Sequence, residues 1–281
     1  MKKGLIKKVV ASALLGIMTM GLVGCGSADN TSSKETKDLL ETIQEKGKVV
    51  VGMSADYAPY EFHYIDENGK DVIGGFDVDI ANEIADAIGV ELVIQEMDFD
   101  ALVAALPAGK IDLVISGMNP TEERAKVVDF SEIYYNSQHG ILVRAEDVDK
   151  YKTFADLEGA KVGAQLGSTQ EQIAKDEIPN ADLQLLANVN NLILELKSGK
   201  VDAIVMEKPV AEMAVKTNPE LAVGKPTYEE ESGGNAVGVA KGNEDLLAKV
   251  NEVIKELNET GKMDEYILKA NELAASANIV E

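Results

Sequence analysis

Three short stretches of this 281-residue sequence carry the charged and polar groups that a small zwitterionic molecule would need. Arg124 follows Thr121-Glu122-Glu123, and its planar guanidinium can hold a carboxylate through two parallel hydrogen bonds. Ser168 and Thr169 follow a glycine at the expected start of a helix, where free N–H groups favour an anion. Glu207 ends an apolar run and supplies the opposite charge. Together these residues suit the two ends of a zwitterion.

Each stretch taken alone also has a purely structural explanation. Arg124 can be a surface residue paired with a neighbouring glutamate, and Ser168 can simply cap a helix. The aromatic residues Tyr57 and Phe99, taken singly, are expected in the core. The binding hypothesis therefore depends on all of these residues lying at the same end of two sheets.

Strand-like and helix-like segments alternate along the chain, which predicts an α/β fold with two largely parallel sheets. The expected strands are residues 49–53, 61–64, 72–73, 92–94, 113–115, 161–164, 183–186 and 203–205. The expected helices are residues 77–88, 100–106, 168–175, 190–196, 209–216, 245–257 and 263–270. The match between residues 106–115 and 196–205 indicates that the two sheets belong to similar lobes.

Two further apolar stretches, residues 140–143 and 236–240, are expected to cross between the lobes and act as a hinge. Ligands bind beyond the carboxyl ends of parallel strands, so the loops at residues 54–57, 116–119 and 165–169, with Glu207, should line the cleft. The expected boundaries are residues 38–139 for the first part of lobe 1, 140–234 for lobe 2, and 235–281 for the hinge return and the rest of lobe 1.

Composition and missing motifs restrict the function. The 49 acidic and 27 basic residues give a net charge of −22, and such a surface repels nucleic acid. The sequence has no glycine-rich phosphate loop, no GxGxxG fingerprint and no GxSxG elbow. Its two histidines, His63 and His139, are not spaced as metal ligands. We therefore expect no cofactor, no metal and no nucleic-acid partner.

The N-terminus has the layout of a secretory signal, with four lysines before an apolar run over residues 9–23. That run is shorter than a membrane-spanning helix needs. The only cysteine, Cys25, follows directly and resembles the acylated cysteine of the bacterial lipoprotein lipobox. An ordinary signal with an incidental cysteine is the alternative. We expect residues 1–24 to be removed, and residues 25–37 to form a lipidated, flexible tether.

Several motifs together resemble the polar amino acid-binding proteins of ATP-binding-cassette importers, also called solute-binding protein family 3. The resemblance runs from about residue 47 to residue 266. The matching segments are residues 74–80 (GGFDVDI), 97–102 (MDFDAL), 109–116 (GKIDLVIS), 121–131 (TEERAKVVDFS), 167–170 (GSTQ) and 243–261. In combination these motifs indicate the family but do not identify one substrate.

The resemblance implies a two-lobed, type II periplasmic-binding-protein fold, with two hinge strands joining sheets that have helices on both faces. Arg124, aided by Ser168 and Thr169, would clamp the α-carboxylate of an amino acid. Glu207 would pair with the α-ammonium group, helped by the carbonyl of Gly117. The family usually has aspartate where Glu207 stands, so the longer side chain must sit differently.

The remaining candidates would surround the rest of the ligand. Asn119 would also support the ammonium group, and Tyr57 and Phe99 would enclose the ligand side chain. Ser54 and Gln165 occupy positions that help to set side-chain preference in the family. Ser54 stands where members that bind lysine or arginine often have aspartate, so an arginine-like and a glutamine-like ligand are both compatible.

The resemblance implies a protein anchored by lipid on the extracytoplasmic face of the cell membrane. It would capture a polar or basic L-amino acid between closing lobes and deliver it to a permease and ATPase complex. We expect a monomer that is not an enzyme. One alternative is a cyclohexadienyl dehydratase-like enzyme on the same fold, although Asp56, Glu61 and Glu207 have no plausible histidine partner at the expected cleft edge. The other is an amino acid sensor, which the lipid anchor and the lack of a spanning helix disfavour.

Overall fold

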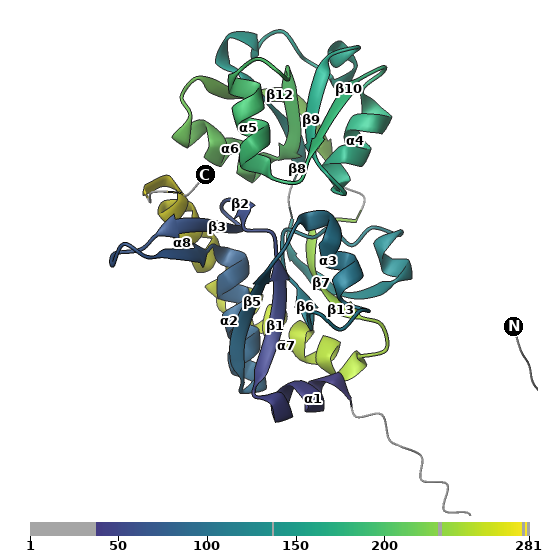
Figure 1. The fold of residues 1–281 in the computed structure, drawn as a ribbon, viewed down its shortest axis with the longest axis vertical. Helices are drawn as coiled ribbons and strands as arrows, with labels where there is room; N and C mark the ends of the chain where they lie inside the picture. Colours follow the sequence, from purple (N-terminus) through teal and green to yellow (C-terminus); the bar gives the residue numbers. More distant parts are fainter. Residues whose placement is uncertain (1–37, 137, 230–231, 277–278, 280–281) are drawn as a thin grey trace, which may run out of the picture. The chain divides into compact units, whose positions relative to one another are not determined.

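The computed structural model describes residues 38–136, 138–229, 232–276 and 279. The expected signal segment, Cys25 and the tether lie outside the described residues. Among the described helices, none is both long enough and apolar enough to cross a membrane. Two five-stranded sheets and one three-stranded sheet form the framework of this part of the chain (Figure 1).

The first five-stranded sheet is made of β1 (Lys48–Met53), β5 (Glu91–Glu96), β6 (Leu113–Val114), β7 (Val128–Tyr135) and β13 (Asn235–Ala240). Its strand order is β5-β1-β6-β13-β7. The central strand β1 is parallel to β5 and β6, whereas β13 is antiparallel to both of its neighbours. Val51 of β1 pairs with Ile94 on one side and Leu113 on the other, and Val51 is fully buried.

The second five-stranded sheet repeats this plan. Its strands are β8 (Gln138–Arg144), β9 (Lys161–Gln165), β10 (Asp182–Leu186), β11 (Ala203–Glu207) and β12 (Leu221–Glu229). Their order is β10-β9-β11-β8-β12. β9 is parallel to β10 and β11, and β8 is antiparallel to β11 and β12. The carboxyl ends of β9 and β11 therefore lie at the same edge of this sheet.

The two apolar stretches expected to cross between the lobes are instead strands inside the sheets. Residues 140–143 belong to β8, which lies between β11 and β12, and residues 236–240 belong to β13, between β6 and β7. A strand with neighbours on both edges and cover on both faces is apolar throughout, which explains these runs. The chain passes between the sheets just before each stretch, from β7 to β8 and from β12 to β13.

Helices cover both sheets, and most of them match the expected segments. The helices packed with the first sheet or with one another are α1 (Leu39–Lys46), α2 (Phe76–Ile88), α3 (Phe99–Ala105), α7 (Glu244–Thr260) and α8 (Lys262–Ser276). Those of the second sheet are α4 (Thr169–Glu177), α5 (Val189–Lys197) and α6 (Lys208–Thr217). α4 and α5 both pack on β9 and flank it in Figure 1.

The similarity between the two halves of the sequence has a structural counterpart. α3 is followed by Gly109 with φ of 65° and then by β6, while α5 is followed by Gly199 with φ of 75° and then by β11. Both glycines take the left-handed conformation that a helix-ending turn requires. The repeat therefore marks the same helix–turn–strand unit in each sheet.

The hairpin expected around residues 61–73 is also present, as part of a small sheet of order β2-β3-β4. Its strands are β2 (Asp56–Tyr57), β3 (Glu61–Ile65) and β4 (Asp71–Gly74). Because β2 begins only three residues after β1 ends, this sheet carries residues 56 and 57 directly beside the first five-stranded sheet.

Candidate ligand-binding site

Arg124 reaches from the first sheet to the second. It opens the 3₁₀ turn η1 (Arg124–Lys126), where its backbone N–H donates to Thr121 Oγ1 at 3.3 Å. Its guanidinium donates to the carbonyl of Asn119 at 2.8 Å and to the carbonyl of Gly167 at 3.0 Å. The guanidinium carbon also lies 5.3 Å from the centre of the Phe99 ring. This half-buried cation is thus held by groups of both sheets.

The start of α4 lies beside that guanidinium. Ser168 is the N-cap: its hydroxyl accepts from the N–H of Glu171 at 3.2 Å and donates to the carbonyl of Gln165 at 2.7 Å. The carboxylate of Glu171 accepts from the N–H of Gly167 at 2.7 Å. The Thr169 hydroxyl has no hydrogen-bond partner among the described residues, although Thr169 is only 9% exposed.

A cavity of about 610 Å³ connects these two features. Phe99 and Arg124 line it from one side, and Gly167, Ser168 and Thr169 line it from the other. The cavity is also lined by Asp100, Glu123, Glu171 and Asp176. An anionic group is therefore favoured only in the part where the Arg124 guanidinium, the start of α4 and the Thr169 hydroxyl, which has no partner among the described residues, face one space.

Glu207 lies outside the lining of that cavity, at the end of β11, and is fully buried. Its Oε1 accepts from Nδ2 of Asn235 at 3.0 Å, and its Oε2 accepts from the Tyr60 hydroxyl. Its backbone N–H donates to the Tyr57 hydroxyl at 3.1 Å. Tyr60, which follows β2, and Asn235, at the start of β13, thus both contact the carboxylate of Glu207 at the end of a strand of the second sheet.

The loop after β6 packs against the same residues. Gly117 has φ of 52°, and a Cβ there would approach the Tyr57 ring to 3.4 Å. The Gly117 carbonyl accepts from Nδ2 of Asn235 at 2.7 Å, and Nδ2 of Asn119 donates to the carbonyl of Gly234 at 3.0 Å. This loop is therefore fixed by residues at the start of β13.

Two buried carboxyl groups lie beneath that loop. Asp77 accepts from the N–H of Gly117 at 2.8 Å and from the Tyr134 hydroxyl at 2.9 Å, and Glu61 accepts from the Ser116 hydroxyl. Burial raises the pKa of Asp77 to about 7, and burial with the neighbouring Asp77 charge raises the pKa of Glu61 well above its usual value. These acids support the loop backbone from within the first body, by which we mean the first five-stranded sheet with the three-stranded sheet and the helices packed on them. The second body is the second five-stranded sheet with α4, α5 and α6.

Asp56 is a third buried carboxyl group, and it joins two residues expected to contact the ligand. Its Oδ1 accepts from the Ser54 hydroxyl at 3.1 Å and from Nε2 of Gln165 at 3.5 Å. Its Oδ2 accepts from the N–H of Val189, the first residue of α5, at 2.6 Å. Gln165 also donates to the carbonyl of Ala187 at 3.0 Å.

Comparison with known proteins places this geometry in context. The family model for bacterial extracellular solute-binding proteins, family 3, matches residues 49–270. The chain belongs to that family.

Individual relatives agree with this assignment. The arginine-binding extracellular protein ArtP of Bacillus subtilis is 35% identical over 94% of this chain and 96% of its own length. The glutamine-binding protein GlnH of the same organism is 32% identical over 94% of this chain and 97% of its own. An arginine-bound crystal structure of the substrate-binding protein AbpA from Streptococcus pneumoniae is 41% identical, with a TM-score of 0.82 over 84% of this chain and 99% of its own. These family 3 relatives are named as binding proteins rather than as enzymes.

The described part of this family 3 protein arranges the ten candidate residues in three groups, which are connected by the hydrogen bonds from Arg124 to Asn119 and from Ser168 to Gln165. Arg124, Phe99, Ser168 and Thr169 share the cavity, whereas Ser54 and Gln165 meet at Asp56. The third group, Tyr57, Gly117, Asn119 and Glu207, gathers around the start of β13.

Sequence reasoning missed three residues that organise these groups. Tyr60 and Asn235 hold Glu207, and Gln170 donates to the Tyr57 hydroxyl at 3.1 Å. Gln170 could have been predicted, because it directly follows Thr169 in the expected helix. Asn235 and Tyr60 lie 175 residues apart in the sequence, and no local pattern indicates that they meet.

Proposed function

We propose that this chain is a lipid-anchored solute-binding protein that closes around a free, basic L-amino acid outside the cytoplasm. It then hands the ligand to the permease and ATPase of an ABC importer. Family 3 membership supports the transport role. Arginine is the first ligand to test, because two of the relatives above are named or crystallised with it.

The observation that carries the proposal is the cavity lined by Arg124 and the start of α4. The α-carboxylate of the ligand would enter there and take hydrogen bonds from the guanidinium, the free N–H groups of the helix and the Thr169 hydroxyl. A buried hydroxyl without a partner is costly unless a guest supplies one. A carboxylate oxygen is such a guest.

Glu207 would bind the α-ammonium group. The two donors that reach its carboxylate in the described chain, the Tyr60 phenol and the Asn235 amide, are both neutral. A fully buried carboxylate is stabilised far more by a cation than by neutral donors alone. Its two oxygens can accept about four hydrogen bonds, so an ammonium group can be added to the existing pair.

The ligand side chain would lie against Phe99 and Tyr57. The Phe99 ring carries the Arg124 guanidinium at 5.3 Å, and a ligand guanidinium would have to use another part of the same ring. Three carboxylates surround Phe99 in sequence, at Glu96, Asp98 and Asp100, and all three are exposed. Their charge would attract a basic side chain rather than a neutral one.

Attachment to the membrane would follow from the N-terminal segment. Residues 1–24 would be removed and Cys25 would carry the lipid, followed by a tether to residue 37. The working unit would be a monomer of two lobes, residues 38–139 with 235–281 and residues 140–234. The original protein should incorporate a labelled fatty acid and a Cys25→Ser variant should not, and equal labelling of the two would contradict the anchor.

A thermal-shift screen of the twenty L-amino acids tests the binding role. A ligand at 100 times its dissociation constant should stabilise the protein by about 2.7 kcal/mol. We expect arginine to give the largest shift and chromatography to recover it unchanged. A shift with glutamine alone would reassign the substrate, no shift with any amino acid would contradict the proposal, and turnover would favour an enzyme.

A further inference from the structure

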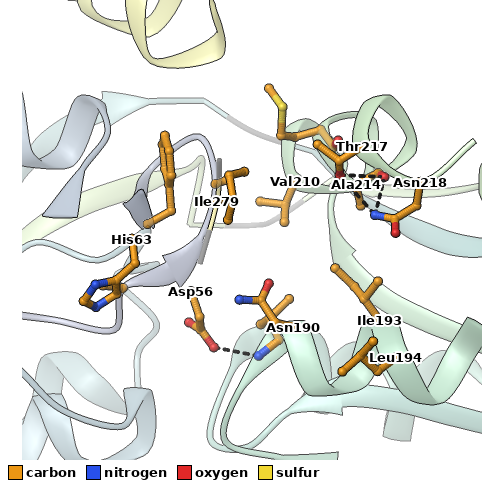
Figure 2. Close-up of a pocket in the computed structure, with 15 residues that line it drawn as sticks. Asp56, His63, Asn190, Ile193, Leu194, Val210, Ala214, Thr217, Asn218 and Ile279 are labelled. Atoms are coloured by element: carbon orange, nitrogen blue, oxygen red, sulfur yellow. Dashed lines mark hydrogen bonds between the residues drawn. The ribbon is translucent and has the colours of Figure 1, made fainter. Parts of the chain in front are cut away.

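Asp56 lies where the two five-stranded bodies meet. It begins β2, next to the first sheet, yet its Oδ2 accepts from the N–H of Val189 at the start of α5, 133 residues further along the chain. Figure 2 shows the Asp56 carboxylate beside the first turn of α5, at one wall of a cavity of about 280 Å³. The contact therefore exists only while the bodies are together.

The second oxygen of Asp56 is shared between the bodies in the same way. The Ser54 hydroxyl donates to it from the first body, and Nε2 of Gln165 donates from the end of β9 in the second. With these donors in place, Asp56 is only 8% exposed. All three donors are neutral, so among the described residues closure removes the carboxylate from water without supplying a cation from the protein itself.

The charged groups that face Asp56 do not change this picture. Glu96 and Asp98 line a second small cavity with Asp56, and Glu61 lies on β3. His63, also on β3, shares the cavity of Figure 2 but is engaged by Asp71 at 2.8 Å and Glu96 at 3.1 Å. The first turn of α5 contributes asparagines and no charge.

We propose that Asp56 couples closure of the two bodies to the uptake of a proton, because its carboxylate is open to water when they separate and enclosed by neutral donors when they meet. This inference rests on the proposed function, since it assumes that ligand binding closes the bodies. Asp56 is then a positioning residue that makes ligand capture tighter in acid.

The electrostatics of the enclosed carboxyl group agree with this direction. Burial raises the pKa of Asp56 from the ordinary value of 3.8 to about 6, against the opposing effect of the Val189 and Ser54 hydrogen bonds. A raised pKa in the closed state means that this state binds more protons than the open one. Ligand affinity should therefore rise as the pH falls from above 6 towards 4, and level off beyond each end of that range.

The size of the effect follows from the same two values. An ordinary pKa in the open state and a pKa of about 6 in the closed state predict about tenfold tighter binding at pH 5.0 than at pH 7.5. Closure should take up roughly 0.8 of a proton at pH 5.0 and almost none at pH 7.5.

Calorimetry of L-arginine binding to the purified protein tests this directly. Titrations at each pH in two buffers with different ionisation enthalpies give the number of protons taken up. Asp56→Asn keeps an oxygen for the Val189 N–H but cannot titrate, so its uptake at pH 5.0 should vanish and its affinity should no longer change between the two pH values. His63→Gln is the matched control, because it removes the histidine that lines the same cavity as Asp56, and it should behave as the original protein does.

Binding without proton uptake at pH 5.0 in the unaltered protein would overturn the inference, whether or not Asp56→Asn folds. Uptake that persists in Asp56→Asn, or disappears in His63→Gln, would also overturn it. Should none of the twenty amino acids give heat or a thermal shift, the proposed function would fail first and this inference with it. The two failures are therefore distinguishable.

Discussion

Replacement of Arg124 by alanine is the most informative perturbation of the proposed carboxylate clamp. The guanidinium has two separate jobs in the structure, since it donates to the carbonyls of Asn119 and Gly167 and it lines the cavity at the start of α4. Its loss could therefore weaken binding either by removing a ligand contact or by loosening the contact between the bodies. A useful experiment must separate these two effects.

The expected loss of affinity follows from how deeply the Arg124 guanidinium and the ligand carboxylate are buried. Removing one partner from a buried ion pair costs about 3–5 kcal/mol, and the half-buried position of Arg124 favours the lower end. A loss of about 3 kcal/mol corresponds to roughly a hundredfold weaker binding of L-arginine. Arg124→Lys keeps the charge but not the bidentate geometry, so its affinity for L-arginine should lie between those of the original protein and of Arg124→Ala.

Isothermal titration calorimetry with L-arginine and with agmatine, its analogue without the carboxylate, separates the two jobs. The original protein should bind agmatine at least as weakly as Arg124→Ala binds L-arginine. Arg124→Ala should distinguish the two ligands much less than the original protein does, because only the contacts of the carboxylate with α4 and Thr169 remain. Lys126→Ala removes an exposed charge from the same turn and should change affinity less than about twofold. If Arg124→Ala weakens both ligands equally, the residue acts through the contact with Gly167 and the clamp is wrong.

Three further predictions concern the residues around the clamp. Glu207→Gln keeps an acceptor for Asn235 but removes the charge, so calorimetry should show L-arginine binding at least about tenfold more weakly. The control Glu212→Gln changes an exposed neighbour and should leave the affinity unchanged. Equal affinities of the two variants would remove Glu207 from the site. Gly167→Ala would place a Cβ 2.7 Å from Cβ of Asp100, so this variant should bind L-arginine more weakly than the control Gly159→Ala does. Gly159 has a similar φ but open space around its missing side chain. Matched affinities of the two variants would mean that the close approach at Gly167 is not needed. The pKa of Asp77 is raised to about 7 in the folded protein, so the native state binds more protons than the unfolded state between about pH 4 and 7. The contribution of Asp77 to the free energy of unfolding is therefore present in acid and lost as the pH rises. Urea unfolding should show Asp77→Asn to be less sensitive to pH than the original protein by a few kcal/mol across that range, and parallel pH dependences would contradict the buried, titrating Asp77.

Local patterns were enough to predict most elements of the fold. α2 shows why: Ile80, Ile84 and Ile88 lie on one buried face, acids occupy its first turn, and Gly89 ends it in the left-handed conformation. These signals act within a few residues of one another, so the sequence displays them directly. The positions of the loops at the strand ends followed from the same reasoning.

Among the missed elements, β12 lacks such local signals, whereas α1 carries them, with Asp38 as its N-cap and Gly47 just after its end. β12 contains Gly224 and Pro226, which normally argue against a strand, and its register shifts between Val223 and Thr227. It lies at the edge of its sheet, where proline and irregular pairing are tolerated. β7 is also an edge strand, with only partial burial along its length. Position in the sheet explains why β12 is a strand, whereas β7 also carries residue types that favour strands, Val128, Phe130, Ile133 and Tyr135.

The candidate site shows the same division between local and distant information. Ser168 and Thr169 were placed correctly at a helix start because a cap is read from adjacent residues. The role of Asp56 depends on Gln165 and Val189, which lie more than a hundred residues away in the sequence. Hydrogen-bond partners of this kind are decided by how the two bodies meet, which no local pattern specifies.

A crystal structure of the protein with bound L-arginine tests the central claim most directly. We predict that the α-carboxylate lies within about 3 Å of the Arg124 guanidinium and the start of α4, with the α-ammonium group against Glu207. A complex in which the Arg124 guanidinium points to solvent, away from the ligand, or in which Glu207 touches only Tyr60 and Asn235, would contradict the account.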